Sequence, residues 1–135
     1  MAIAYDATST ATYGANPSWS HTCSGSDRIL FVIVGSAQDP SISSLTYNSV
    51  AMTKITETTY PGVGYSGMSI WYLVAPATGS NTIAITGTGN MGAMAVSYTG
   101  ASQTGVPDSS TVNNNSTKTN SLTVTTTVVN SDCWL

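Results

Sequence analysis

The sequence contains few charged side chains. Only 7% of its 135 residues are Asp, Glu, Lys or Arg, whereas about a quarter is usual for a globular domain. Three basic residues cannot form the positive stripe that binds a nucleic-acid backbone, and they cannot anchor a chain to an anionic membrane. Long solvated helices, which carry Glu and Lys on their exposed faces, are disfavoured as well. We therefore expect no nucleic-acid partner.

Several other sequence features are also missing. One His and two Cys without a CxxC motif cannot complete a structural zinc site, and we expect no metal or cofactor. No apolar run reaches the ~18 residues of a membrane span, and the first residues lack the basic and apolar regions of a signal peptide. We expect no membrane insertion and a chain made in the host cytoplasm, which then works there, leaves by another route or is released by lysis within a particle.

The two cysteines, Cys23 and Cys133, lie far apart in the sequence. A disulfide between them would close a long loop and stabilise the fold. Without a signal peptide, two buried thiols are favoured over that bond.

What the sequence does contain is Thr, Val and Ser in alternating patterns. Trp19, His21 and Cys23 alternate with polar residues, which is the period of a half-buried strand. Residues 24–27 have turn composition, and residues 28–34, which are apolar after Arg28, are typical of a central strand. Residues 19–34 therefore predict a hairpin whose Trp19, His21 and Cys23 face inward.

Further strands follow, separated by turn signals at intervals of about ten residues. The predicted segments are residues 45–54 as a hairpin around Asn48-Ser49, then 68–75, 82–86, 91–99 and 122–128, with a glycine-rich loop over 57–67. This spacing predicts an all-β fold, a single antiparallel β-sandwich that is jelly-roll-like. Residues 1–14 are expected to be an N-terminal arm or edge strand, and residues 15–135 the sandwich domain. The residues expected in its core are Trp19, Cys23, Leu30, Val32, Trp71, Leu73 and Val96.

The chain ends in "NSDCWL", which reads as the start of an apolar strand rather than a polar terminus. Either this strand completes a sheet at its last residue or the native chain continues beyond Leu135. The apolar ending favours continuation.

The stretch "WSHTCSGSDR" contains the residue types of a serine hydrolase. Neighbouring strand residues point to opposite faces, however, so His21 does not converge with Ser24 or Ser26, and no GxSxG motif is present. A hydrolase built on His21, Asp27 and Glu57 is the least favoured function. We predict a protein without catalytic residues.

Tyr60 and Tyr65 lie in the predicted glycine-rich loop. Exposed loop aromatics stack on sugar rings or anchor protein interfaces, so these two residues are the candidate interface or glycan contacts. The alternative is that the loop folds over an open end of the sandwich.

Four segments, taken in order, carry a resemblance: "WSHTCSGSDRILFVIV", "LTYNSVAMTKI", "SIWYLVAPATGSNTIAIT" and "AVSYTGASQT". Over about residues 15 to 105 the chain resembles β-sandwich proteins common in bacteriophage and environmental bacteria, many of them described only as phage structural proteins. The resemblance implies a jelly-roll-like sandwich on a virion or cell surface, and members that run on past the point where this chain stops. It supplies no catalytic residues.

These observations favour a non-catalytic virion structural protein, such as a capsid decoration, head-fibre or tail-associated subunit. Its expected partners are other virion subunits, and we expect it to form a homo-oligomer. The alternative is a carbohydrate-binding or adhesin module on a phage or bacterial surface, with a glycan as partner.

Overall fold

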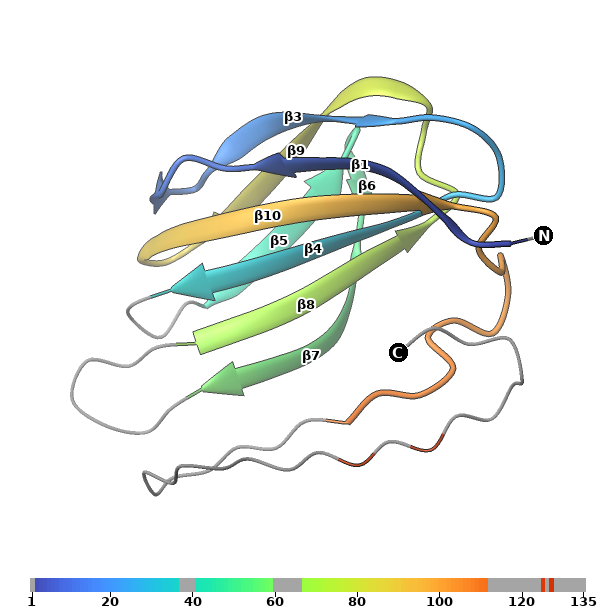
Figure 1. Cartoon of the computed structure of the whole chain (residues 1–135). Coiled ribbons are helices and arrows are strands. Elements are labelled where there is room, and N and C mark those ends of the chain that lie inside the picture. The colour runs from blue at the N-terminus through green and yellow to red at the C-terminus, as the bar shows by residue number, and fades with distance from the viewer. Residues whose placement is uncertain (1, 37–40, 60–66, 112–124, 126, 128–135) are drawn as a thin grey trace.

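The computed structural model is built from β-strands arranged in two antiparallel sheets. It describes residues 2–36, 41–59, 67–111, 125 and 127. The two sheets form separate layers (Figure 1). Among the described residues, no helix has the length and apolar character needed to cross a bilayer.

The first sheet has six strands. Its main path is β1 (Ala4–Thr10), β10 (Asn90–Thr99), β4 (Ile29–Ser36), β8 (Gly67–Val74) and β7 (Thr53–Thr59), and β2 (Gly14–Ala15) pairs with one end of β10. The second sheet has four strands, in the order β3 (Ser18–Cys23), β9 (Gly79–Gly87), β5 (Ile42–Tyr47) and β6 (Val50–Ala51). Segment β1 is thus an edge strand within the sandwich.

The strand pairs are nested along the chain. β1 pairs with β10, β3 with β9, β4 with β8, and β5 with β6, and successive pairs alternate between the two sheets. A long hairpin folded over on itself gives this pattern, which is the jelly-roll arrangement. The predicted fold class, a single antiparallel β-sandwich of jelly-roll type, is confirmed.

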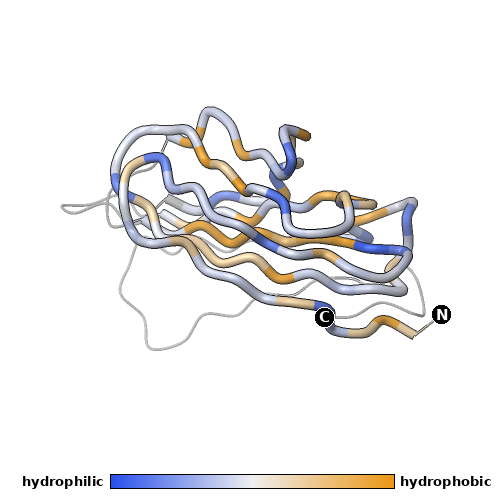
Figure 2. Tube along the Cα trace, turned by 90° about the horizontal axis from the view of Figure 1, so that it is seen from above, coloured by the Kyte–Doolittle hydropathy of each residue, from blue (hydrophilic) through white to orange (hydrophobic). Residues whose placement is uncertain are grey.

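Alternating side chains of both sheets fill the space between them, and the same alternation of apolar and polar residues is visible along the strands in Figure 2. The core consists of Cys23, Leu30, Val32, Val34, Leu45, Tyr47, Met52, Trp71, Ile83, Ile85, Met91 and Ala95. Tyr47 is fully buried, and its Oη donates to the carbonyl of Ala77 at 3.0 Å and accepts from Asn81 Nδ2 at 3.2 Å.

The predicted hairpin over residues 19–34 is wrong. Its two strands, β3 and β4, belong to different sheets. The turn between them includes Gly25 and Asp27 at positive φ, and it carries the chain from one layer to the other. Each of the two strands turns one face toward the core between the sheets, so both contain buried residues. The alternation of apolar residues in the sequence does not say which strands pair.

The hairpin predicted around Asn48-Ser49 is confirmed, because Thr46 and Tyr47 pair with Ala51 and Val50. Asn48 and Ser49 both have positive φ, at 49° and 64°, as a two-residue turn of type I′ requires. The strand that follows divides at Met52 into β6 and β7, which lie in different sheets.

The core prediction is correct for Cys23, Leu30, Val32 and Trp71, which are buried. Trp19 and Leu73 are only partly buried and pack against the core from its margin. Val96 was predicted wrongly. In β10 the inward positions are Met91, Ala93, Ala95 and Ser97, so Val96 faces outward with Met94 and Tyr98.

The later strands lie close to where the sequence placed them, in β8, β9 and β10. β7 extends to Thr59, into the stretch expected to be a loop. The predicted strand over residues 122–128 lies outside the described residues, apart from Thr125 and Thr127, which are exposed.

The matched substitutions Val32→Ala and Val96→Ala test which face of the sheet holds the core. Val32 is fully buried, and its truncation should lower the free energy of unfolding by about 2–3 kcal/mol because it leaves a cavity. Val96→Ala, in the neighbouring strand, should cost less than about 1 kcal/mol in dilute protein. Urea denaturation measures both values, and equal losses would contradict the assigned faces.

Candidate functional site

The only His of the chain lies at the centre of a chain of hydrogen bonds between the two sheets. His21 is on β3 and is 1% exposed, and it shares an inward face with Cys23, as predicted. Its Nδ1 lies 2.8 Å from Ser9 Oγ on β1, and its Nε2 lies 3.0 Å from Ser97 Oγ on β10. The imidazole therefore links the four-stranded sheet to two strands of the six-stranded sheet.

Both ends of this network have a fixed direction. Trp19 Nε1 can only donate, and it does so to Ser9 Oγ at 3.0 Å. The Asp6 carboxylate can only accept, and Ser97 Oγ donates to it at 2.7 Å. The backbone N–H of Ser24 donates to the same carboxylate at 3.0 Å, and the Ser24 hydroxyl donates to its other oxygen.

These directions define the tautomer of His21. Since the single hydroxyl hydrogen of Ser97 is used on Asp6, Ser97 Oγ must accept from His21 Nε2–H. In a neutral imidazole Nδ1 is then the acceptor, and Ser9 Oγ–H donates to it. Hydrogen bonds thus run one way, from Trp19 through Ser9, His21 and Ser97 to Asp6, and we call these five residues the polar relay.

A β-bulge places the carboxylate at the end of the polar relay. The register between β1 and β10 shifts between Tyr5 and Ala7, which leaves Asp6 as the extra residue. A bulge re-aims the side chain of its extra residue. Tyr5 therefore points outward opposite Tyr98, while the Asp6 carboxylate reaches Ser97.

The pKa values of the two titratable groups agree with these directions. Burial lowers the pKa of His21, and attraction to Asp6 opposes that change only in part. Partial burial by itself would raise the pKa of Asp6, but hydrogen bonds from Ser24 and Ser97 and attraction to His21 hold it below its ordinary value. A neutral imidazole beside an ionised carboxylate is the state that satisfies every donor of the polar relay.

Ser9 and His21 have the spacing of a nucleophile and its base, but the rest of a hydrolase site is arranged differently. In a catalytic triad the acid binds the imidazole directly, whereas here Ser97 lies between Asp6 and His21. The other acids named from the sequence are held elsewhere. Asp27 is in the turn before β4, and Glu57 accepts from Lys54 Nζ at 2.6 Å. The polar relay is a cross-link between sheets.

Burial also raises the pKa of the Cys23 thiol. Cys23 is a free thiol within the described part of the chain, and Cys133 lies outside that part, as do Tyr60 and Tyr65. Within the same ranges, no group of three or more His, Cys, Asp and Glu side chains could hold a metal ion.

The second feature is the side of the six-stranded sheet that faces away from the core. Neighbouring strands align apolar residues there in rows, such as Val96 beside Phe31 and Phe31 beside Tyr72. The next row aligns Met94, Ile33 and Ile70. We define the outer face by its apolar residues, which are Tyr5, Ile29, Phe31, Ile33, Met68, Ile70, Tyr72, Val74, Met94, Val96 and Tyr98.

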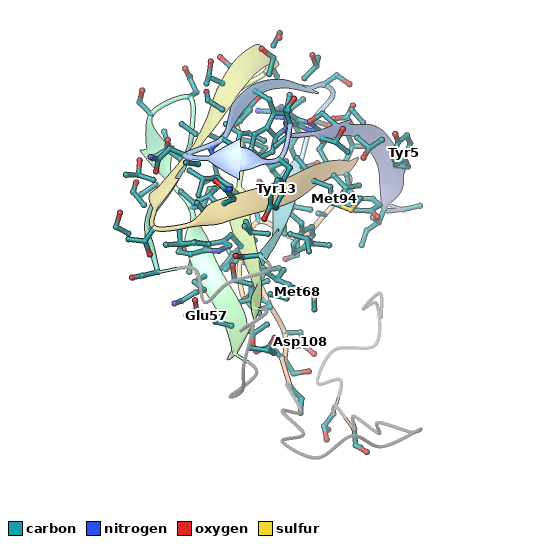
Figure 3. The ribbon with its side chains drawn as sticks, turned by 90° about the vertical axis from the view of Figure 1, so that its left-hand side faces the viewer. Tyr5, Tyr13, Glu57, Met68, Met94 and Asp108 are labelled. Carbon is teal, nitrogen blue, oxygen red and sulfur yellow. The ribbon has the colours of Figure 1, made fainter. Side chains whose placement is uncertain are left out.

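The outer face carries no charged side chain on the described strands. Its margins are threonines instead, with Thr8 and Thr10 on β1, and Thr53, Thr56 and Thr58 on β7. Lys54 and Glu57 of β7 pair with Trp71 and Ser69, which point inward, so both charges lie on the other side of the sheet. Figure 3 shows Tyr5, Met94 and Met68 on one side and Glu57 on the other.

One end of the outer face is covered by the segment that follows β10. Gln103 Nε2 donates to the carbonyl of Arg28 at 3.3 Å, and Tyr72 Oη donates to the carbonyl of Val106 at 3.0 Å. Away from that end, Met94 is 42% and Met68 48% exposed. The uncovered part of the face thus carries large apolar side chains in contact with solvent.

Sequence reasoning singled out His21 but not Asp6, Ser9 or Ser97 as its partners. Ser97 and Asp6 are 91 positions apart and His21 and Ser97 are 76 apart, so no local pattern connects them. The sequence signal of the outer face is the unbroken apolar run of residues 29–34, in which both alternating sets of side chains are apolar.

A comparison of the chain with protein-family models, with curated proteins and with solved structures finds no match in any of the three. The resemblance to phage proteins stays a prediction.

Substituting Ser97→Ala tests the polar relay. It removes the acceptor of His21 Nε2–H and a donor to Asp6, both in a buried setting, and should lower the free energy of unfolding by about 1–3 kcal/mol. Ser44→Ala on an exposed position of β5 is the matched control, with an expected change within about 0.5 kcal/mol. Equal effects in thermal or urea unfolding would show that the polar relay contributes nothing.

The lowered pKa of His21 predicts a loss of stability in mild acid. The unfolded chain takes up a proton near the ordinary pKa of about 6.5, whereas the folded chain resists it. Stability is therefore complete above pH ~6.5 and should fall as the pH drops through that value toward the folded-state pKa, by at most about 1.4 kcal/mol per pH unit. Asp6, whose folded pKa is lowered, adds a second loss below about pH 4.

His21→Gln is the comparison for this pH profile, because Gln keeps polar atoms but does not titrate. Urea denaturation at intervals between pH 7 and 5 should give a sloped profile for the wild type and a flat one for the variant. Parallel slopes would contradict a neutral His21 in the folded state.

Proposed function

We propose that this chain is a non-catalytic structural module that acts by protein–protein assembly through the outer face of its six-stranded sheet. The observation that carries the proposal is the composition of that face, which is apolar at the centre, has threonines at its margins and lacks charge on the described strands. Contiguous exposed apolar patches mark interaction surfaces in soluble proteins. An apolar centre within a polar rim is the usual anatomy of a protein interface.

The polar relay supports a structural role as well. Ser9 Oγ and His21, the pair with the spacing of a nucleophile and its base, are engaged in hydrogen bonds that hold β1 and β10 against β3. β1 contributes Tyr5 and its threonines to the outer face, so the polar relay fixes the edge of that face. A rigid surface loses little entropy when it binds, which favours assembly.

The setting as a capsid decoration, head-fibre or tail-associated subunit in a virion rests on the sequence resemblance alone. The carbohydrate-binding alternative depends on Tyr60 and Tyr65, which lie outside the described residues. A glycan array with wild type and Tyr65→Ala separates that alternative, since sugar binding lost in the variant would favour it.

Assembly through the outer face is tested by expressing tagged chains in their native context and fractionating the cleared extract on a density gradient. We expect the wild type to sediment faster than free chain and the double variant Met68→Lys/Met94→Lys to sediment at the position of free chain. Each new charge would need to be desolvated within the interface.

The control is Val50→Lys. Val50 is also a large exposed apolar residue, 52% exposed, but it lies in the four-stranded sheet. It should sediment with the wild type. The proposed function would be refuted if the wild type and both variants sedimented as free chain. It would also be refuted if the double variant sedimented with the wild type.

A further inference from the structure

We infer that the partner of the outer face is the outer face of a second copy of this chain, which gives a two-fold symmetric dimer. The inference rests on the proposed function and adds the identity of the partner. β4 is the middle strand of the main path of the six-stranded sheet, so a two-fold axis through the centre of the face brings Phe31 and Ile33 of the two copies together.

The charge distribution favours a like partner. A two-fold symmetric interface brings the same patch of both copies together. A charged residue on the patch would therefore lie near the same charge of the other copy. The outer face lacks charge on the described strands, and Lys54 and Glu57 neutralise each other on the other side of β7. A chain with a net charge of only -3 adds little repulsion between copies. On its described strands the face offers no charged group that would select a partner of opposite sign.

The size of the face fits a weak, reversible dimer. Five strands form its main path, and with strands about 4.8 Å apart and outward residues every ~6.7 Å, its projected area is roughly 500 Å². The segment after β10 covers one end of the face, so two copies would bury at most roughly 1,000 Å² before the contours of the side chains are counted. That is the lower bound for a specific interface, so we expect a weak and reversible dimer.

The outer face is rich in aromatic and methionine side chains, which pack well against one another. Tyr5 packs edge-to-face on Tyr98, and Tyr98 on Phe31, with ring centroids 6.4 and 6.5 Å apart. Aromatic residues and methionine are enriched in interfaces, and methionine adapts to irregular gaps. Two apolar sheets also pack face to face readily, at about 10 Å, as they do within a sandwich. A closed two-fold pair covers both faces and leaves none for further growth.

The first measurement is analytical ultracentrifugation of the purified chain over a hundredfold range of concentration. We expect a reversible monomer–dimer equilibrium for the wild type and for Val50→Lys. Met94→Lys should raise the dissociation constant by about 30-fold or more, as expected for a charge placed in an interface centre. Circular dichroism confirms that each variant is folded.

The second measurement is oxidation of methionine by dilute hydrogen peroxide, read by peptide mass spectrometry at low and high protein concentration. Met68 and Met94 are exposed on the face, whereas Met52 and Met91 are 6% and 0% exposed in the core and serve as internal controls. In the dimer Met68 and Met94 should become protected, while Met52 and Met91 are protected at every concentration.

The combined outcomes separate this inference from the proposed function. A monomer whose Met68 and Met94 oxidise readily would overturn the dimer but leave the face free for another protein partner. A dimer in which both methionines stay reactive would also overturn the inference, because the contact would lie elsewhere. A monomer in which both are protected would overturn the dimer and the proposed function together, since the face would then be covered within the single chain.

Discussion

The constraint on which the structure depends is that the central strands of the six-stranded sheet are apolar on both sides. β4 contributes Leu30, Val32 and Val34 to the core, and its alternate residues Phe31 and Ile33 face away from it. The four-stranded sheet covers only one of these sides. Within the described part of the chain, the core between the sheets is filled while a second apolar surface remains on the six-stranded sheet, and the proposed assembly follows from that surface.

The polar relay connects the two sheets at the edge of the sandwich. β1 lies at the edge of the six-stranded sheet and β3 at the edge of the other. His21 reaches from one sheet to Ser9 and Ser97 of the other, and the chain of donors ends on a carboxylate whose pKa is lowered by the same hydrogen bonds. A fully satisfied buried network specifies one arrangement of its strands. It sets the position of β1 and hence the margin of the outer face.

The sequence predicted the fold class because the alternation of apolar residues and the turn signals are local properties. It identified the strands in β8, β9 and β10 and the Asn48-Ser49 turn for that reason. Strand pairing is not local, and so the residues around Ser24–Asp27 were assigned to a hairpin although they connect two sheets. Val96 was placed in the core because an apolar residue in a strand with two apolar faces carries no mark of which face is inside. The partners of His21 could not be found from spacing, since β1 and β10 meet only in the folded chain.

Photo-crosslinking from a single position of the outer face shows whether that face contacts another chain. A benzoylphenylalanine placed at position 94 lies on the outer face, and one placed at position 50 lies in the four-stranded sheet. We expect irradiation of the assembled protein to join position 94 to another polypeptide chain and to leave position 50 without such a product. Crosslinks from position 94 that stay within one chain, or intermolecular crosslinks from position 50 alone, would contradict it.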